Sequence, residues 1–199
     1  MITALQAAQL AQRTYTDRPT YGAEDGAGRA VVYGETVVGF PGSNNVACWL
    51  ADLDAIAEHV LGMGLVHSGF WSAFQEIAKP LMELRAVDVV LGHSEGAALA
   101  LIYAAQLCIA GKPPRAVFAF EPPRISADGT IASILKAHGV QLLLTQNGED
   151  VVPMIPRLLE NWQHPAPLTK IGKASDPFPN IADHMMGSVI ASLEAIPLA

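Results

Sequence analysis

A short apolar run that leads into a long apolar helix pattern constrains the fold of this chain more than any other feature. Residues 86–91 form an apolar, mostly β-branched run that ends at Gly92. Residues 95–110 are apolar nearly all round until Gly111 and two prolines stop the pattern. Neither segment keeps a polar face for solvent, so both are expected to be buried. The chain therefore predicts a central strand, a sharp turn and a buried helix.

The same alternation continues along the chain. Strands are predicted at residues 116–120, 140–145 and 168–171, and a hairpin at residues 30–40. Helical spacing appears from about residue 3, at 46–60, 68–84 and 131–138, and near the C-terminus. Strands that alternate with helices predict an α/β fold, a mostly parallel central sheet with helices on both faces. No shift in composition marks a boundary, so residues 1–199 are expected to form one domain.

Composition and charge exclude several classes of partner. With 199 residues and 51% apolar residues, the chain can bury a sizeable core. Its net charge of -7, without a basic cluster, disfavours nucleic acid and anionic membranes as partners. The longest apolar stretch, residues 97–110, is shorter than the roughly 20 residues that span a bilayer. No signal peptide is visible at the N-terminus, which predicts a cytoplasmic protein. The oligomeric state is left open.

The predicted sharp turn carries the pentapeptide Gly92-His93-Ser94-Glu95-Gly96. In a G-x-S-x-G turn between a strand and a helix, the serine is exposed for attack in a strained backbone conformation. The two glycines avoid collisions between the strand and the helix. Ser94 is therefore predicted to be a nucleophile, and an ordinary strand-to-helix turn is the alternative.

Further blocks accompany this pentapeptide in a fixed order. They are FPGS at 40–43 with WLADL at 49–53, VHSGF at 66–70, GHSEGAALA at 92–100, FEPPR at 120–124, DVVP at 150–153 and DH at 183–184. Together they resemble the class 3 lipases, the fungal-lipase-like branch of the α/β-hydrolase fold, from about residue 30 to residue 190. The resemblance implies a serine carboxylic ester hydrolase, a lipase or esterase that uses a Ser-His-Asp triad, an acyl-enzyme intermediate and no cofactor.

The acid of such a triad follows the nucleophile in the chain and lies on a loop beyond a strand. Asp150 follows the predicted strand at 140–145, and the resemblance indicates the same residue. Glu149 and Asp128 remain alternatives. Asp128 lies in a turn sequence in which aspartate commonly bonds its own backbone.

The base follows the acid, and His184 lies at the start of the terminal helix, where this fold places it. His138, at a helix end, and His164, expected to be an exposed loop residue, are the alternatives. The histidines show no metal-ligand spacing, so no metal site is expected.

The resemblance also indicates the groups that would bind an oxyanion. The backbone N–H groups of Ser43 and Glu95 are expected to hold it. A carboxylate pointing into this site would oppose negative charge, so the Glu95 side chain is expected to point away. Pro41 and Glu95 are departures from the family's pattern.

Substrate contacts are predicted less directly. Residues 44–50 correspond to a mobile lid in the resembling lipases, and a fixed helix is the alternative. Apolar candidates for binding a small-molecule or lipid ester are Trp49, Leu50, Met154 and Ile155. The residues alone leave open an acyltransferase, a thioesterase, a peptidase or a catalytically silent binding module. They also leave open the acyl chain length and the choice between esterase and lipase.

Overall fold

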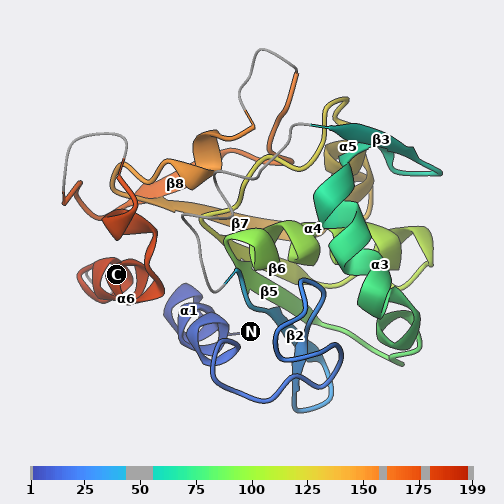
Figure 1. The fold of residues 1–199 in the computed structure, drawn as a ribbon, viewed down its shortest axis with the longest axis horizontal. Helices are drawn as coiled ribbons and strands as arrows, with labels where there is room; N and C mark the ends of the chain where they lie inside the picture. The colour runs from blue at the N-terminus through green and yellow to red at the C-terminus, as the bar shows by residue number, and fades with distance from the viewer. Residues whose placement is uncertain (1, 44–55, 157–160, 176–179, 197–199) are drawn as a thin grey trace.

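A computed structural model of the protein describes residues 2–43, 56–156, 161–175 and 180–196 (Figure 1). Its centre is a six-stranded sheet in the order β1-β2-β5-β6-β7-β8. The strands are β1 Val31–Tyr33, β2 Val37–Phe40, β5 Val89–His93, β6 Ala116–Phe120, β7 Gln141–Asn147 and β8 Leu168–Ile171. Strand β1 pairs with β2 in antiparallel fashion, and every other neighbouring pair is parallel. The predicted hairpin and the mostly parallel sheet are confirmed.

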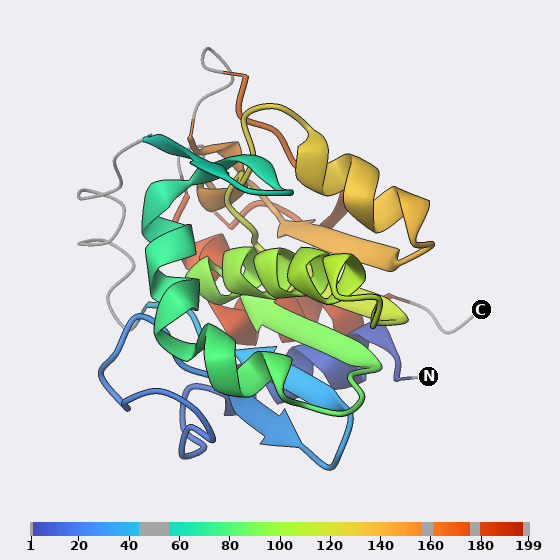
Figure 2. The same ribbon diagram turned by 90° about the vertical axis from the view of Figure 1, so that its right-hand side faces the viewer.

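Helices cover both faces of this sheet (Figures 1 and 2). On one face lie α1 Ala4–Arg13 and α6 Met186–Glu194, and on the other lie α3 Ser68–Met82, α4 Glu95–Ile109 and α5 Thr130–Ala137. Side chains of β5 alternate between the faces. Val90 joins the core around α4, whereas Val89 and Leu91 join the core around α1. The predicted α/β-hydrolase architecture, a mostly parallel sheet with helices on both faces, is confirmed.

Helix α4 is the most deeply buried helix element of the described chain, as its uninterrupted apolar pattern predicts. It contacts β5 and β6 below it and α3 and α5 beside it. Most of its side chains, such as Leu99 and Tyr103, are completely buried. The turn that carries Ser94 therefore leads into a helix that cannot move without disrupting the core.

The predicted helix over residues 46–60 is wrong at its C-terminal end, and residues 44–55 lie outside the described residues. Strand β3 Ala57–Val60 pairs with β4 Gly64–His67 in a separate antiparallel hairpin. Gly62 and Gly64 adopt positive φ values of 79° and 74°, which allow the chain to reverse between the two strands. Strand pairing thus overrides the local helical spacing, a tertiary effect that periodicity does not report.

The carboxyl ends of β5, β6 and β7 lie next to one another, because these strands are parallel neighbours. Ser94 and Glu121 follow the first two strands immediately, and Asp150 follows β7 by a short loop. Ligands of open parallel sheets bind at this edge. None of the described helices is long and apolar enough to cross a membrane. The expectation of one domain over residues 1–199 stays a prediction.

Candidate active site

The turn between β5 and α4 holds Ser94 in an unusual backbone conformation. Its φ of 57° and ψ of -129° lie outside the regions that ordinary residues prefer, at a cost of roughly 1–3 kcal/mol. Two backbone hydrogen bonds hold it there. The N–H of Ser94 donates to the carbonyl of Phe120 at 2.9 Å, and its own carbonyl accepts from Ala97 at 2.9 Å. Hydrogen bonds to β6 and α4 thus stabilise the strained turn.

The two glycines of the pentapeptide are required by close packing. A Cβ on Gly92 would collide with the backbone of Gly96. A Cβ on Gly96 would collide with the carbonyls of Phe40 and Pro41. The elbow therefore brings helix α4 directly against the segment that contains Ser43.

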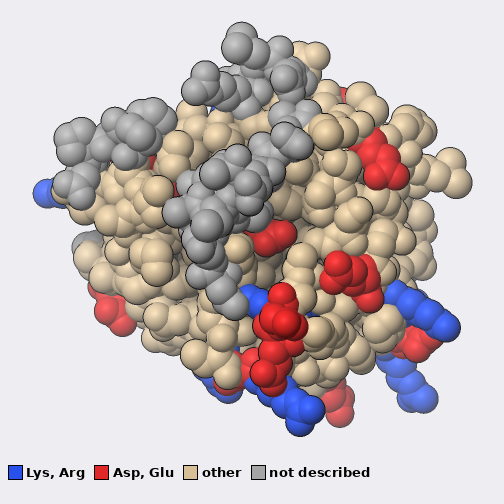
Figure 3. Space-filling view, in the orientation of Figure 1, with Lys and Arg blue, Asp and Glu red and all other residues tan. Residues whose placement is uncertain are grey.

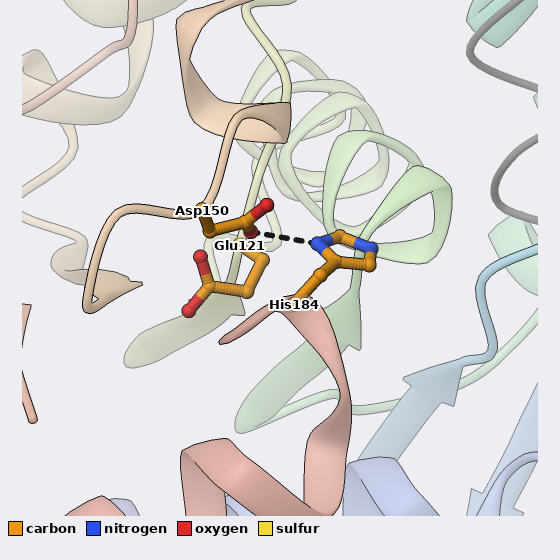
Figure 4. Close-up of side chains that lie close together, drawn as sticks. All are labelled: Glu121, Asp150 and His184. Carbon is orange, nitrogen blue, oxygen red and sulfur yellow. Dashed lines mark hydrogen bonds and ion pairs between the residues drawn. The ribbon is translucent and has the colours of Figure 1, made fainter. Parts of the chain in front are cut away.

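His184 and Asp150 form a buried acid–base pair (Figure 4). Nδ1 of His184 lies 2.7 Å from Oδ2 of Asp150, and neither side chain is exposed. The other Asp150 oxygen, Oδ1, accepts from the backbone N–H of Val152 at 3.0 Å. Because a carboxylate only accepts, Nδ1 carries the proton and Nε2 of a neutral His184 is free to accept one.

The two atoms that would exchange a proton have no other partner in the part of the chain that the structure describes. Among the described residues, Nε2 of His184 and Oγ of Ser94 are both buried without a hydrogen bond. The imidazole of His93, the residue before Ser94, lies 4.6 Å from that of His184, measured between ring centroids. Catalytic hydrogen bonds are commonly loose without substrate, so Ser94 and His184 remain candidates for the nucleophile and the general base.

His93 connects the elbow to the base through a short chain of hydrogen bonds. Its Nε2 donates to the backbone carbonyl of His184 at 2.7 Å, so its Nδ1 accepts from the hydroxyl of Tyr15 at 2.6 Å. Burial, together with the charge of a protonated His184, lowers the pKa of His93 well below its usual value. His93 is therefore neutral and fixed in one tautomer.

The alternative acids have other roles. Asp128 accepts from the backbone N–H of Leu65 at 2.7 Å and from that of Thr130 at 3.0 Å, and it thereby holds β4 against the start of α5. Glu149 is partly exposed and forms an ion pair with Lys170 at 3.2 Å. Of the three candidates, only Asp150 reaches His184.

The alternative bases lie elsewhere. His138 bonds the carbonyl of Ile134 at the end of α5, as its position predicts. His164 is half-buried and donates from Nε2 to the carbonyl of Pro153 at 2.8 Å, so the expectation that it is exposed is wrong. The carbonyl that it bonds belongs to a segment 11 residues earlier in the chain, a contact that the residues next to His164 do not indicate.

Of the oxyanion groups predicted from the resemblance, Glu95 belongs to the elbow, and Ser43 follows Gly42, which packs against Ser94. Glu95 is the first residue of α4, so its backbone N–H has no acceptor within the helix. The side chain of Arg29 donates to the carbonyl of Gly42 at 3.0 Å and so fixes the segment that leads to Ser43. Burial raises the pKa of Glu95 to about 7, with Arg29 lowering it and Glu76 raising it.

A cavity of about 300 Å³ lies between α1, α6 and the oxyanion segment. The residues that line it include Tyr15, Ser43, His93, Met185 and Met186. Among the predicted substrate contacts, Met154 is 39% exposed and Ile155 half-buried, and neither lines this cavity. The other two, Trp49 and Leu50, lie outside the described residues. The sequence had not indicated α1 as part of the site.

A second carboxyl group at the site, Glu121, was missed by the sequence reasoning. Ligand atoms of Glu121, Asp150 and His184 all lie within 4.8 Å of one another (Figure 4). Such a cluster has the spacing of a metal site, but Asp150 and His184 already satisfy each other. Two ionised carboxylates at this distance would repel by about 3 kcal/mol at an effective dielectric constant of about 20. The only signal was that Glu121 falls within the block at 120–124.

Asp183 fixes the loop that carries the base. Its carboxylate accepts from the side chain of Asn180 at 2.7 Å and from the backbone N–H groups of Glu149 and Ser175 at 3.0 and 3.1 Å. Burial raises the pKa of Asp183, but the hydrogen bonds outweigh burial and lower it overall. The block at 183–184 thus contains a loop anchor beside the histidine.

The parallel sheet, the strained turn after β5 and the buried Asp–His pair beyond β7 define the α/β-hydrolase class. Residues 37–160, more than half of the chain, match the family model described as Lipase (class 3). The chain belongs to the class 3 lipase family. The resemblance read from the sequence blocks is confirmed.

Curated relatives from fungi agree with this family. A secreted mono- and diacylglycerol lipase A of Penicillium cyclopium is 32% identical over 165 residues, which cover 77% of this chain and 52% of the relative. The secreted mono- and diacylglycerol lipase 1 of Fusarium solani is 30% identical over 145 residues, covering 67% of this chain and 43% of the relative. The chain thus spans about half the length of these relatives.

These relatives correct one expectation. The predicted cytoplasmic location is wrong, because the matched lipases are named as secreted proteins. That prediction rested only on the pattern of the first residues, which carries no information from the fold.

Solved structures agree on the fold. A fungal lipase–inhibitor complex, described as a model for interfacial activation, superposes with a TM-score of 0.71 at 19% identity and covers 91% of both chains. The lipase–propeptide complex of Rhizomucor miehei gives a TM-score of 0.67 at 19% identity over 88% of this chain and 68% of that one. At these identities the likeness concerns the fold alone.

Proposed function

We propose that this protein hydrolyses carboxylic esters of lipids through Ser94, His184 and Asp150. The hydrogen bond of 2.7 Å between His184 and Asp150, fully buried at the sheet edge where Ser94 lies, carries the proposal. A buried imidazole with one nitrogen held by a carboxylate and the other unpaired is prepared to accept a proton.

In the first step, Nε2 of His184 takes the hydroxyl proton as Oγ of Ser94 attacks the ester carbonyl. The imidazolium that forms is stabilised by Asp150, whose charge lies against Nδ1. His184 then returns the proton to the leaving alcohol, which leaves an acyl group on Ser94. Water, activated by the same imidazole, releases the acid and restores the serine.

The tetrahedral oxyanion would be held by the N–H groups of Ser43 and Glu95. Removing one donor of this kind typically costs about 3 kcal/mol of transition-state stabilisation. Both proposed donors belong to the backbone. Their placement depends on the contact between Gly96 and residues 40–41, and on the hydrogen bond from Arg29 to Gly42.

The proposed substrate is a neutral lipid ester such as a mono- or diacylglycerol. The names of the Penicillium and Fusarium relatives support this class and support action outside the cell. Methionine and tyrosine side chains that line the cavity of about 300 Å³ provide an apolar surface for part of the ester. On the face in Figure 3, acidic and basic side chains lie mainly along the lower edge, and large described areas carry neither.

The proposal is tested by labelling with a fluorophosphonate and by assays on mono-, di- and triacylglycerols. Wild-type protein should be labelled at Ser94, and Ser94→Ala should lose both labelling and hydrolysis. Ser133→Ala, which changes an exposed serine of α5, should keep both. Hydrolysis by Ser94→Ala at the wild-type rate would refute the proposal.

A further inference from the structure

Glu121 is a buried carboxyl group that the proposed reaction does not use. It is the first residue after β6, and its side chain has no exposed surface. Its backbone φ of 51° is one that residues with side chains rarely adopt. A charged residue type at a buried and strained position calls for a local explanation.

The two oxygens of Glu121 have different surroundings. Oε1 accepts from the backbone N–H of Asn147 at 2.7 Å. Oε2 is buried, and no donor reaches it among the described residues. In Figure 4 the Glu121 carboxyl lies beside that of Asp150 and points away from the His184 ring. The neighbour available to Oε2 is therefore another acid.

The number of donors decides which of the two acids is ionised. Both oxygens of Asp150 accept, one from Nδ1 of His184 and the other from the N–H of Val152. Among the described residues Glu121 accepts from one donor, the N–H of Asn147, so Asp150 is the better site for the negative charge. A contact between two buried carboxyl groups becomes favourable when one of them is protonated. The group that accepts fewer hydrogen bonds is the one that keeps its proton.

We propose that Glu121 is a positioning residue of the proposed triad, a neutral carboxylic acid whose Oε2–H donates a hydrogen bond to the carboxylate of Asp150. This inference rests on the proposed function. With this bond, Asp150 is held from the β6 side as well as by Val152, and its charge remains directed at the imidazole.

The charges around Glu121 favour the same state. Burial is the largest cause that raises the pKa of Glu121 well above its usual value, followed by the hydrogen bond and the charge of Asp150. Asp183 adds to the rise, and the N–H of Asn147 opposes it. His184, the remaining titratable group of this cluster, is turned with Nδ1 toward Asp150.

Two substitutions of Glu121 distinguish a protonated carboxyl group that donates a hydrogen bond from an ionised carboxylate. Glu121→Gln keeps the size, keeps an oxygen for Asn147 and places an N–H toward Asp150. Glu121→Leu removes both interactions. A hydrogen bond to a buried charge corresponds to roughly a 10- to 100-fold effect. We therefore expect kcat of Glu121→Leu to fall by about that factor with KM little changed, and Glu121→Gln to recover most of it. Thermal unfolding of each variant checks that it is folded.

Infrared spectroscopy provides a readout that does not depend on activity. The difference spectrum of wild type and Glu121→Gln at pH 7 should contain the carbonyl stretch of one protonated carboxylic acid. Absence of this band, or a Glu121→Gln protein that is as inactive as Glu121→Leu, would overturn the inference. Failure of the proposed function would look different, because wild-type Ser94 would then resist the fluorophosphonate.

Discussion

Nε2 of His93 donates a hydrogen bond of 2.7 Å to the backbone carbonyl of His184. The residue before the proposed nucleophile thus holds the main chain of the proposed base, although the two are far apart in sequence. The hydroxyl of Tyr15, two residues after the end of α1, completes this connection by bonding Nδ1 of His93. These two hydrogen bonds therefore connect the elbow, the main chain of the proposed base and the segment that follows the first helix.

Removing the hydroxyl of Tyr15 should weaken the connection between the elbow and the proposed base. Tyr15→Phe leaves Nδ1 of His93 buried without a donor, which costs about 1–3 kcal/mol. We expect a lower free energy of unfolding and a lower kcat, measured by urea denaturation and ester hydrolysis. Tyr33→Phe is the matched control, because Tyr33 is half-buried and the bond from its hydroxyl to the carbonyl of Leu10 is long, at 3.4 Å. Equal effects of the two substitutions would contradict the assignment.

Replacing the acid should affect kcat far more than binding. Asp150→Asn no longer holds Nδ1 of His184 as the proton donor, and a change of this kind lowers kcat by about 10⁴. Hydrolysis of a soluble ester, analysed as kcat and KM, measures the effect. Glu149→Gln, one residue earlier and with its side chain paired to the exposed Lys170, should behave like wild type. The opposite order of the two variants would assign the acid to Glu149.

A methyl group on Gly96 should separate the elbow from the oxyanion segment. Its Cβ would press on the carbonyls of Phe40 and Pro41, and overpacking of this kind costs about 1–3 kcal/mol. Gly96→Ala should therefore unfold at a lower temperature and lose hydrolysis. Gly26→Ala should be tolerated, because its Cβ meets only ordinary contacts with Ala23. A fully active Gly96→Ala protein would refute the packing argument.

Glu95 should make both activity and stability depend on pH near neutrality. Its pKa of about 7 means that negative charge accumulates between pH 6 and 8 on the residue whose backbone N–H is a proposed oxyanion donor. The ratio of kcat for Glu95→Gln to that of wild type should therefore rise over this range. Glu83→Gln, an exposed change, should show a constant ratio.

The sign of the stability effect follows from the raised pKa of Glu95. The contribution of protonated Glu95 to the stability of the fold is complete below pH 4.5, the usual pKa. This contribution is lost as the pH rises to about 7. Over this interval the free energy of unfolding of Glu95→Gln should therefore rise relative to that of wild type, by at most about 3 kcal/mol. Denaturant unfolding at pH 4.5, 6 and 8 measures this difference. A difference that does not change with pH would show that Glu95 is not buried as described.

Much of the fold could be predicted because its signals are local. The apolar runs of β5 and β6 and the all-round apolar α4 can be read from consecutive residues, and the elbow glycines stand at a fixed spacing around Ser94. The helix predicted over residues 46–60 was wrong where β3 forms, because pairing with β4 supplies hydrogen bonds that no periodicity encodes. Cellular location was also predicted wrongly, since it does not depend on the fold.

The residues alone were enough to predict the class of the protein, the candidate nucleophile at Ser94 and the order of acid and base along the chain. Asp150, Glu149 and Asp128 all satisfy that order, so the choice of the acid that meets His184 required the folded chain. It also brought Tyr15, His93 and Glu121 to the site. Their protonation states depend on burial and on charges contributed by distant segments. Those interactions arise only when the ends of parallel strands become neighbours.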